Sequence, residues 1–427
     1  MTIHVVGAGE SAYTIALDYG VSAERLIQEN GITDPNRLAV GQTLVIQYPE
    51  TVHRIAPGDT LTGIARQYGV TVNQLLRNNR GLAGRNLLIP GEELVISYQQ
   101  AKYGEMSVNG YAYPFIEREL LLNTLPYLTY LTPFTYGFTA EGELVDLDDQ
   151  ELIARSWEFG VGPLMHLSTL TEEGGFSNDL AHIALNDLAV QERLIQNVLE
   201  TIQRKGYYGL DVDFEFVFPE DRVPYADFIR NITQQLNREG YQVICALAPK
   251  TSSDQKGLLY EGHDYALIGA AANAVLLMTY EWGYTYGPPM AVAPIPNVRA
   301  VLDYAVTQIP RDKIYMGVPA YGYDWPLPFV QGTTRARSIS CQEAIDLAVR
   351  YGVEIQYDEN AQAPFFTYYD ESGVRHEVWF EDARSIREKL ALIPEYDFLG
   401  VGYWNLMRPF PQNWLVLNAL YNIRRIG

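Results

Sequence analysis

Short apolar runs typical of buried strands alternate with amphipathic helical patterns along the chain from about residue 99 onward. Two of the helical patterns are Gln191–Arg204 and Tyr225–Arg238, in which apolar residues recur at helical spacing. Eight such alternations over roughly 330 residues leave few possible folds, and they predict an α/β architecture built as a (β/α)8 TIM barrel. The predicted strands are Val108–Tyr113, Leu128–Phe138, Pro163–Ser168, Gly209–Phe216, Gln242–Ala248, Ala274–Trp282, Lys313–Tyr321 and Phe398–Leu406.

The gap between the seventh and eighth predicted strands is long enough to hold a further unit. Residues 331–380 contain the strand-like segments Gln356–Asp358, Phe365–Tyr369 and Glu377–Phe380, with the spacing of a hairpin. We therefore expect a small α+β insertion at this point of the barrel.

The first hundred residues contain an internal repeat with a period of about 49 residues. Each copy is predicted to form a strand, a capped helix, a Gly-Val turn, a second helix and a closing strand, which makes a small β-α-α-β module. The predicted domains are therefore residues 1–48, 50–98 and 99–427. The matched residues are His4, Gly9, Ile15, Ala16, Tyr19, Gly20, Val21, Leu26 and Asn30 in the first copy, and His53, Gly58, Ile64, Ala65, Tyr68, Gly69, Val70, Leu75 and Asn79 in the second.

The repeated module resembles the LysM domain. The first copy departs from the pattern, because Ala12 replaces Leu61 and Val40 replaces Pro90 of the second copy. The resemblance implies binding to polymers that contain N-acetylglucosamine, such as peptidoglycan and chitin, so that the modules would anchor the chain to a glycan. A repeat retained for its structure alone is the alternative. The resemblance rests on Gly58–Leu61, Ile64–Ala65, Tyr68–Val70, Asn78–Asn79 and Ile89–Gly91.

The formal net charge of −21 limits the partners of this chain. It disfavours nucleic acid, for which a basic surface is expected, and it requires that any anionic polymer be recognised at short range. The two cysteines, Cys245 and Cys341, form no disulfide framework and lack the spacing of metal ligands. No segment is apolar enough to span a membrane, and no Sec signal peptide is visible. We expect a monomer without nucleic-acid or membrane partners.

Three carboxylates lie at alternate positions of the fourth predicted strand, Gly209–Phe216. Side chains alternate between the two faces of a strand, so Asp211, Asp213 and Glu215 are predicted to share one face. Active-site groups of a TIM barrel project from the C-terminal ends of the strands, which would place Glu215 at the mouth and Asp211 deepest. Three acids this close cannot all ionise easily, so at least one is expected to hold a proton near neutral pH. Cation binding or a surface strand is the alternative reading of this motif alone.

The same strand, Gly209–Glu215, resembles the signature strand of glycoside hydrolase family 18, which contains chitinases and endo-N-acetylglucosaminidases. Matching segments lie on the predicted sixth, seventh and eighth strands, at Met278–Tyr280, Gly317–Tyr323 and Tyr403–Trp404. The family pattern begins with a further Asp where this chain has Tyr208. We therefore expect retained activity with an altered pH profile.

The resemblance to family 18 implies a retaining, substrate-assisted mechanism in which Asp211, Asp213, Glu215 and Tyr280 are catalytic. Glu215 would protonate the glycosidic oxygen and later deprotonate water, while the 2-acetamido oxygen of the substrate attacks the anomeric carbon. Asp213 would orient the acetamido N–H, and Tyr280 would donate a hydrogen bond to the acetamido oxygen. Trp404 would form a floor beneath the sugar ring.

Further substrate-binding candidates lie beside these residues, although packing alone is the alternative for each of them. His166, on the third predicted strand, is interpreted as a satisfied barrel histidine and is assigned no role. The candidates are Glu281, Trp282, Tyr321, Tyr403 and Asn405, with Tyr323 as a weaker one.

Two LysM modules followed by a family 18 barrel resemble the cortex-lytic N-acetylglucosaminidases of endospore-forming bacteria. The resemblance implies an endo-acting enzyme of the spore, at the boundary of coat and cortex. It would hydrolyse β-1,4 bonds after N-acetylglucosamine in cortex peptidoglycan, next to muramic acid or its δ-lactam, and it would need no metal or organic cofactor. A chitinase or chitooligosaccharide hydrolase would use the same residues. A non-hydrolytic peptidoglycan-binding lectin is disfavoured by the presence of Asp213, Glu215 and Tyr280.

Overall fold

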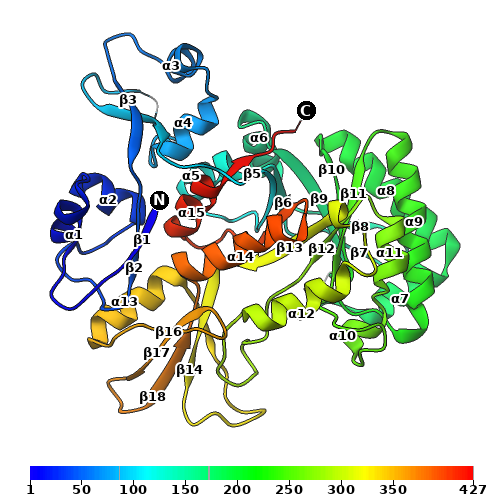
Figure 1. The fold of residues 1–427 in the computed structure, drawn as a ribbon. Coiled ribbons are helices and arrows are strands. Elements are labelled where there is room, and N and C mark those ends of the chain that lie inside the picture. Colours follow the sequence, from blue (N-terminus) through cyan, green and yellow to red (C-terminus); the bar gives the residue numbers. More distant parts are fainter. Residues whose placement is uncertain (86, 172–173, 427) are drawn as a thin grey trace.

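The computed structural model describes residues 1–85, 87–171 and 174–426. Within these residues eight parallel strands form a closed barrel, which confirms the predicted fold class (Figure 1). The eighth strand pairs with the first to close the barrel, with Gly400 opposite Ser107. A short further strand, β20 (Tyr421–Ile423), pairs with the N-terminal end of the first strand. In order around the barrel the strands are β5 (Gly104–Ala112), β6 (Tyr130–Pro133), β9 (Gly162–Ser168), β10 (Gly209–Asp213), β11 (Gln242–Leu247), β12 (Ala274–Leu277), β13 (Ile314–Pro319) and β19 (Gly400–Trp404).

Each barrel strand overlaps its predicted range, but β10 ends earlier than expected. The strand stops at Asp213, so Glu215 follows it at the second position beyond its end. The physical reason lies at Phe214, whose carbonyl oxygen is 2.9 Å from Nε2 of His263 instead of continuing the strand ladder. The Phe214 ring is fully buried and stacks on Phe228 of the surrounding helix layer.

Amphipathic helices cover the outside of the barrel. In α8 (Leu188–Lys205) the side chain of Asp187 caps the N-terminus, and Gly206 ends the helix in the left-handed conformation at φ 76°. Its buried residues Leu194, Ile195 and Val198 recur at helical spacing and face the sheet. The other helices of this layer are α5 (Arg118–Thr124), α6 (Gln150–Glu158), α7 (Asn178–Asn186), α9 (Arg222–Arg238), α10 (Leu258–Glu261), α11 (Tyr265–Ala271), α12 (Ile295–Ala305), α14 (Ala383–Tyr396) and α15 (Pro411–Leu420).

A separate antiparallel sheet lies between β13 and β19, as the sequence predicts for an insertion at this point. It begins at Tyr321, directly after the seventh barrel strand, so Tyr321 belongs to the insertion sheet and not to the barrel. The sheet order is β15-β14-β18-β17-β16. Its elements are β14 (Tyr321–Pro326), β15 (Arg337–Ser340), α13 (Cys341–Tyr351), β16 (Gln356–Asp358), β17 (Ala363–Tyr369) and β18 (Arg375–Trp379), while a small hairpin elsewhere pairs β7 (Gly137–Phe138) with β8 (Leu144–Val145).

The N-terminal repeat forms two β-α-α-β modules with the same internal contacts. In the first, the imidazole of His4 lies 2.8 Å from Glu10 and 3.2 Å from the Tyr19 hydroxyl. In the second, His53 makes the equivalent contacts at 2.8 Å to Asp59 and 3.1 Å to the Tyr68 hydroxyl. The modules comprise β1 (Thr2–Val5), α1 (Ala12–Tyr19), α2 (Ala23–Asn30) and β2 (Thr43–Ile46), and β3 (Pro49–Arg54), α3 (Leu61–Tyr68), α4 (Val72–Asn78) and β4 (Glu93–Tyr98).

Both modules pack directly on the barrel domain through α15. In the first module the hydroxyl of Thr43 donates to Gln412 at 2.8 Å, and in the second the guanidinium of Arg77 donates to Asn418 at 3.1 Å. Arg77 also donates to the carbonyl of Pro126, in the segment that precedes β6. The second module therefore lies at the N-terminal end of the barrel strands, whereas the insertion follows the C-terminal end of β13 (Figure 1).

Candidate active site

Two aspartates of β10 lie side by side on the inner face of the barrel near its C-terminal end. Asp211 is opposite His166 of β9, and Asp213 is opposite Ser168. Both carboxylates are buried, and on each the Oδ1 atom has no hydrogen-bond partner among the described residues. The Tyr111 hydroxyl of β5 donates a 2.5 Å hydrogen bond to Oδ2 of Asp211. Unpaired buried carboxylate oxygens are costly, so this cluster has the character of a functional site.

Burial dominates the protonation of Asp211. It raises the pKa of Asp211 to about 6, while the charge of His166 and the hydrogen bond from Tyr111 act in the opposite direction. The negative charge of Asp213 adds to the upward shift. The inner part of the site therefore resists carrying two full negative charges.

Glu215 lies just beyond the end of β10, where its side chain is only partly exposed. Burial raises the pKa of Glu215 to about 8, and the charges of Asp213 and Glu281 raise it further in the same direction. The expectation that one acid of the motif holds a proton near neutral pH is met at this residue. A carboxyl group that keeps its proton at pH 7 can act as a general acid.

Glu281 approaches the same region from the segment after β12. Its backbone is in the left-handed region at φ 68°, an uncommon conformation for a residue with a β-carbon. The hydroxyls of Tyr321 and Tyr323 both donate to its carboxylate, the latter at 3.0 and 3.1 Å. The insertion sheet thus holds Glu281 in place, and Glu281 in turn modifies the charge around Glu215.

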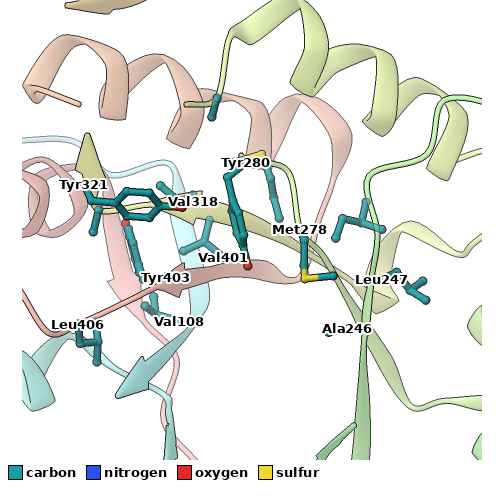
Figure 2. Close-up of a cluster of buried hydrophobic side chains, with 14 of the residues drawn as sticks. Val108, Ala246, Leu247, Met278, Tyr280, Val318, Tyr321, Val401, Tyr403 and Leu406 are labelled. Atoms are coloured by element: carbon teal, nitrogen blue, oxygen red, sulfur yellow. The ribbon is translucent and has the colours of Figure 1, made fainter. Parts of the chain in front are cut away.

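Tyr280 projects into the barrel beside Met278 and Val318 (Figure 2). A β-carbon on Gly317 would lie 2.7 Å from the Tyr280 ring, so the glycine leaves the space that this ring occupies. Burial and the charges of Asp213 and Glu215 raise the pKa of the Tyr280 phenol well above its ordinary value. Tyr280 is therefore a hydrogen-bond donor close to both acids.

Aromatic rings line the opposite side of the site. Trp404, at the end of β19, packs edge-to-face on Phe134 with 4.9 Å between ring centroids and lies 5.8 Å from Tyr111. It also lies 6.3 Å from Tyr113, whose pKa is raised by burial and by the charge of Glu215. The partly exposed indole of Trp404 is thus held rigidly within an aromatic cluster next to the acids.

Comparison with known proteins identifies this arrangement. The family Glycosyl hydrolases family 18 matches residues 166–408, which include Asp211, Asp213, Glu215, Tyr280 and Trp404. This chain belongs to glycosyl hydrolase family 18. The LysM domain matches residues 4–47 and 53–97, which confirms both copies of the repeat.

Two relatives of this family 18 glycoside hydrolase match it over nearly the whole chain. The cortical fragment-lytic enzyme of Bacillus subtilis (strain 168) is 42% identical over 99% of this chain and 99% of its own length. The crystal structure of the Bacillus cereus spore cortex-lytic enzyme SleL superposes with a TM-score of 0.84 at 38% identity, covering 99% of this chain and 98% of that one. The chitinase from Chromobacterium violaceum has a TM-score of 0.69 at 27% identity, and the match covers 74% of this chain and 98% of that one.

The structure does not bring every predicted residue to the family 18 site. Tyr403 is fully buried and packs on Trp414 of α15, with 5.1 Å between ring centroids, because it points from β19 to the face opposite Trp404. We therefore leave Tyr403 out of the site. Trp282 and Asn405 are partly exposed near the barrel mouth, where Asn405 accepts a 3.2 Å hydrogen bond from the backbone of Met407.

Tyr208, which replaces the first aspartate of the family motif, lies at the other end of the barrel. Its ring packs against Tyr130 at 5.7 Å and Trp157 at 6.2 Å. It lies five positions before Asp213 in the sequence, which corresponds to roughly 16 Å along an extended strand. The altered pH profile expected from this replacement therefore has no structural support.

Several residues of the site carried no recognisable signal in the sequence. Tyr111, Thr135 and His166 contact the two aspartates or one another, although they come from three different strands or their ends. The one usable clue was that His166 occupies an inward position of a predicted barrel strand next to the acids. Within the described residues no cluster of three or more His, Cys, Asp or Glu side chains is arranged to hold a metal ion. No helix in this part of the chain has the length and apolar character needed to cross a membrane.

The two LysM modules differ in the loop that precedes their second strand. In the second module this loop exposes Leu87 and Ile89, which are 81% and 53% accessible. The equivalent positions of the first module are Arg37 and Ala39, and Ala39 is buried in the same apolar cluster as the barrel core. A groove of about 660 Å³ also lies between the modules, away from the acids of the barrel. In this loop the second module offers the more accessible apolar surface, whereas the first module exposes Tyr13 and Leu17 of α1.

Proposed function

We propose that this family 18 enzyme is an endo-acting N-acetylglucosaminidase of spore cortex peptidoglycan. It would hydrolyse the β-1,4 bond after N-acetylglucosamine, next to muramic acid or its δ-lactam. The observation that carries this proposal is the full-length match to cortical fragment-lytic enzymes, which covers both LysM modules and the barrel at 42% identity. The matches to chitinase structures cover 74% of the chain, in contrast to the SleL match.

The proposed reaction begins with proton transfer from Glu215 to the glycosidic oxygen. The proton is available at neutral pH because burial and two nearby carboxylates raise the pKa of Glu215 to about 8. The substrate's own acetamido oxygen closes on the anomeric carbon, so no carboxylate nucleophile is needed and the configuration is retained. The same Glu215, now ionised, removes a proton from the incoming water.

Asp213 and Tyr280 would bind and orient the acetamido group during this step. Asp213 has a carboxylate oxygen with no hydrogen-bond partner among the described residues, which can accept the acetamido N–H and balance the developing positive charge. The Tyr280 phenol stays protonated and can donate to the acetamido oxygen. Asp211 is fixed by Tyr111 behind Asp213, and Trp404 supplies the apolar floor for the sugar ring.

The units 1–48, 50–98 and 99–427 would divide the work between anchoring and hydrolysis. We assign the principal glycan contact to the second LysM module, since its loop exposes Leu87 and Ile89. The first module would mainly fix the pair to the barrel through its buried loop around Ala39. Such anchoring raises the local concentration of cortex glycan near the active site in the spore, and it requires only a monomer.

Mass spectrometry of fragments released from purified spore cortex tests this function. The wild type should release fragments with reducing-end N-acetylglucosamine, and Glu215→Gln should release none. Glu220→Gln, which changes an exposed acid of the next turn, is the matched control and should behave as the wild type. Release from chitin oligosaccharides but not from cortex would favour a chitinase, and binding without release from either would favour a lectin.

A further inference from the structure

His166 is a fully buried histidine that lies against the catalytic carboxylates. Its Nε2 atom is 3.6 Å from Oδ2 of Asp213, and neither this nitrogen nor Oδ1 of Asp213 has a hydrogen-bond partner among the described residues. Its ring is enclosed by Phe134 at 4.7 Å and by the edge of Tyr111 at 5.7 Å. Buried polar atoms without a protein partner are costly, which favours a proton located between this nitrogen and the Asp213 carboxylate.

The other ring nitrogen of His166 fixes how its protons can be distributed. Nδ1 lies 2.6 Å from the hydroxyl oxygen of Thr135, which is also within reach of Ser168 at 2.9 Å and of the Tyr136 carbonyl at 3.1 Å. If Thr135 donates to Nδ1, the neutral ring carries its proton on Nε2. If Thr135 accepts from Nδ1, an unprotonated Nε2 would face a carboxylate lone pair, which is repulsive unless a proton lies between them. Either arrangement places one proton between His166 and Asp213.

His263 provides a contrast within the same fold. It is also fully buried, but both of its ring nitrogens have partners, since Nδ1 accepts from the Ala248 backbone at 2.9 Å and Nε2 faces the Phe214 carbonyl at 2.9 Å. Burial lowers the pKa of His263 to about 4, which keeps it neutral. His263 therefore serves as an internal reference for a structural histidine.

We propose that His166 is a positioning residue that shares a proton with Asp213 and thereby sets the charge carried by the Asp211–Asp213 pair. The inference rests on the proposed function only in assigning Asp213 and Glu215 to catalysis. His166 does not contact the substrate in this scheme. It acts through Asp213, which must be ionised to receive the acetamido N–H.

The groups that face His166 determine the direction of its effect. They are Asp211 and Asp213 from β10, the Tyr111 phenol from β5, the hydroxyls of Thr135 and Ser168, and beyond them Glu215 and the Tyr280 phenol from the segment after β12. No lysine or arginine is among them. Loss of the His166 proton donor would therefore make the aspartate pair take up a proton at higher pH. With less negative charge behind it, Glu215 would then ionise at lower pH.

The pH dependence of kcat/KM for His166→Met tests the proposal, because methionine has a similar volume but no group that can donate a proton to Asp213. In the bell-shaped pH profile of kcat/KM, the acid limb is expected to shift to higher pH and the basic limb to lower pH, each by roughly 1 pH unit. The pH range of activity therefore narrows from both sides. Unchanged limbs in a folded variant would overturn the proposal, whatever the loss in kcat. The substrate is cortex fragments, or chitin oligosaccharides if the wild type releases nothing from cortex.

Nitrogen-15 spectra of histidine-labelled wild-type enzyme test the same proton without substrate and without the variant. Asp213→Asn assigns the His166 signals, since this substitution changes its immediate neighbour. We expect a proton on Nε2 of His166 from pH 5 to pH 8. An Nε2 that is bare over this range would overturn the proposal even if His166→Met fails to fold. Because no turnover is needed, failure of the proposed cortex activity leaves this result readable.

Discussion

The backbone N–H of Ile355, in the insertion, donates a 2.9 Å hydrogen bond to the carbonyl of Val40 in the first LysM module. The contact is backbone to backbone, and the adjacent Gly41 carbonyl also accepts from Arg384 of α14 at 3.3 Å. The insertion, the barrel helices and the first module are thus joined at one point. The LysM pair is a fixed part of the enzyme and not a module on a flexible linker.

This junction predicts that Gly41→Ala will destabilise the docking of the first module. A β-carbon at Gly41 would lie 1.9 Å from the Ile355 carbonyl oxygen, in addition to the strain of φ 83°. Gly91→Ala is the matched control, because the equivalent glycine has φ 97° but open space around it. We expect a loss of about 1 kcal/mol for Gly91→Ala and of about 3 kcal/mol or more for Gly41→Ala, measured by denaturant unfolding. Equal losses would show that the junction is not tight.

Because Glu215 keeps its proton in the folded state, we expect it to lower the free energy of unfolding as pH rises. The carboxyl of an unfolded chain ionises above a pKa of about 4.3, whereas folded Glu215 keeps its proton to about 8. Between these values the unfolded state binds fewer protons, so this group makes the free energy of unfolding fall as pH rises. Glu215→Gln should therefore raise Tm more at pH 8 than at pH 5, by an amount equivalent to about 1–3 kcal/mol. The same Tm difference at both pH values would contradict the proton assignment.

The charge of Glu281 is expected to influence the pH at which activity falls on the alkaline side of the pH–rate profile. Its negative charge helps to raise the pKa of Glu215, so Glu281→Gln should move the basic limb from near pH 8 to lower pH by roughly 0.5–1 unit. Tyr323→Phe removes one donor to Glu281 but leaves the Tyr321 hydrogen bond and the charge, and it serves as the control. Rate measurements between pH 5 and 9 distinguish the two variants. A basic limb that Glu281→Gln leaves in place would rule out this electrostatic coupling.

The position of Tyr208 predicts that restoring the family's aspartate has no effect on pH dependence. Tyr208→Asp should leave both limbs unchanged, because the residue lies at the opposite end of the barrel from Glu215. It should cost about 1–2 kcal/mol of stability, since the packing on Tyr130 and Trp157 is lost. Thermal unfolding and a pH–rate profile of the same preparation check both statements, with Tyr208→Phe as the conservative control.

Substitutions in the exposed loop of the second LysM module are expected to weaken binding to insoluble cortex without changing turnover of soluble fragments. Replacing Leu87 and Ile89 by Ser should reduce retention on insoluble cortex about tenfold, while turnover of soluble fragments stays the same. Arg37→Ser, at the equivalent exposed position of the first module, is the control and should be retained as the wild type is. Pull-down with insoluble cortex measures retention. Equal loss from both modules would refute the division between them.

Much of this protein followed from the sequence alone, because the decisive signals are local and periodic. Alternating strand and helix patterns predict the barrel, and the 49-residue repeat predicts the two modules. The spacing of Asp211 and Asp213 predicts that they share a face of β10, since strand side chains alternate with a period of two. The motif around Glu215, Tyr280 and Trp404 indicated the family by residue type and order.

Only the tertiary structure decided which distant residues complete the site. His166 faces Asp213 because β9 and β10 pair in one particular register. Tyr321, which the sequence assigned to a barrel strand, reaches Glu281 from the insertion sheet. Tyr403 turns away from the site because its neighbour Trp404 takes the inward position on β19. Strand register, loop paths and the faces of packed modules depend on contacts between residues far apart in the chain. Local periodicity carries no information about them, and so the proton balance of the active site could be described only from the folded molecule.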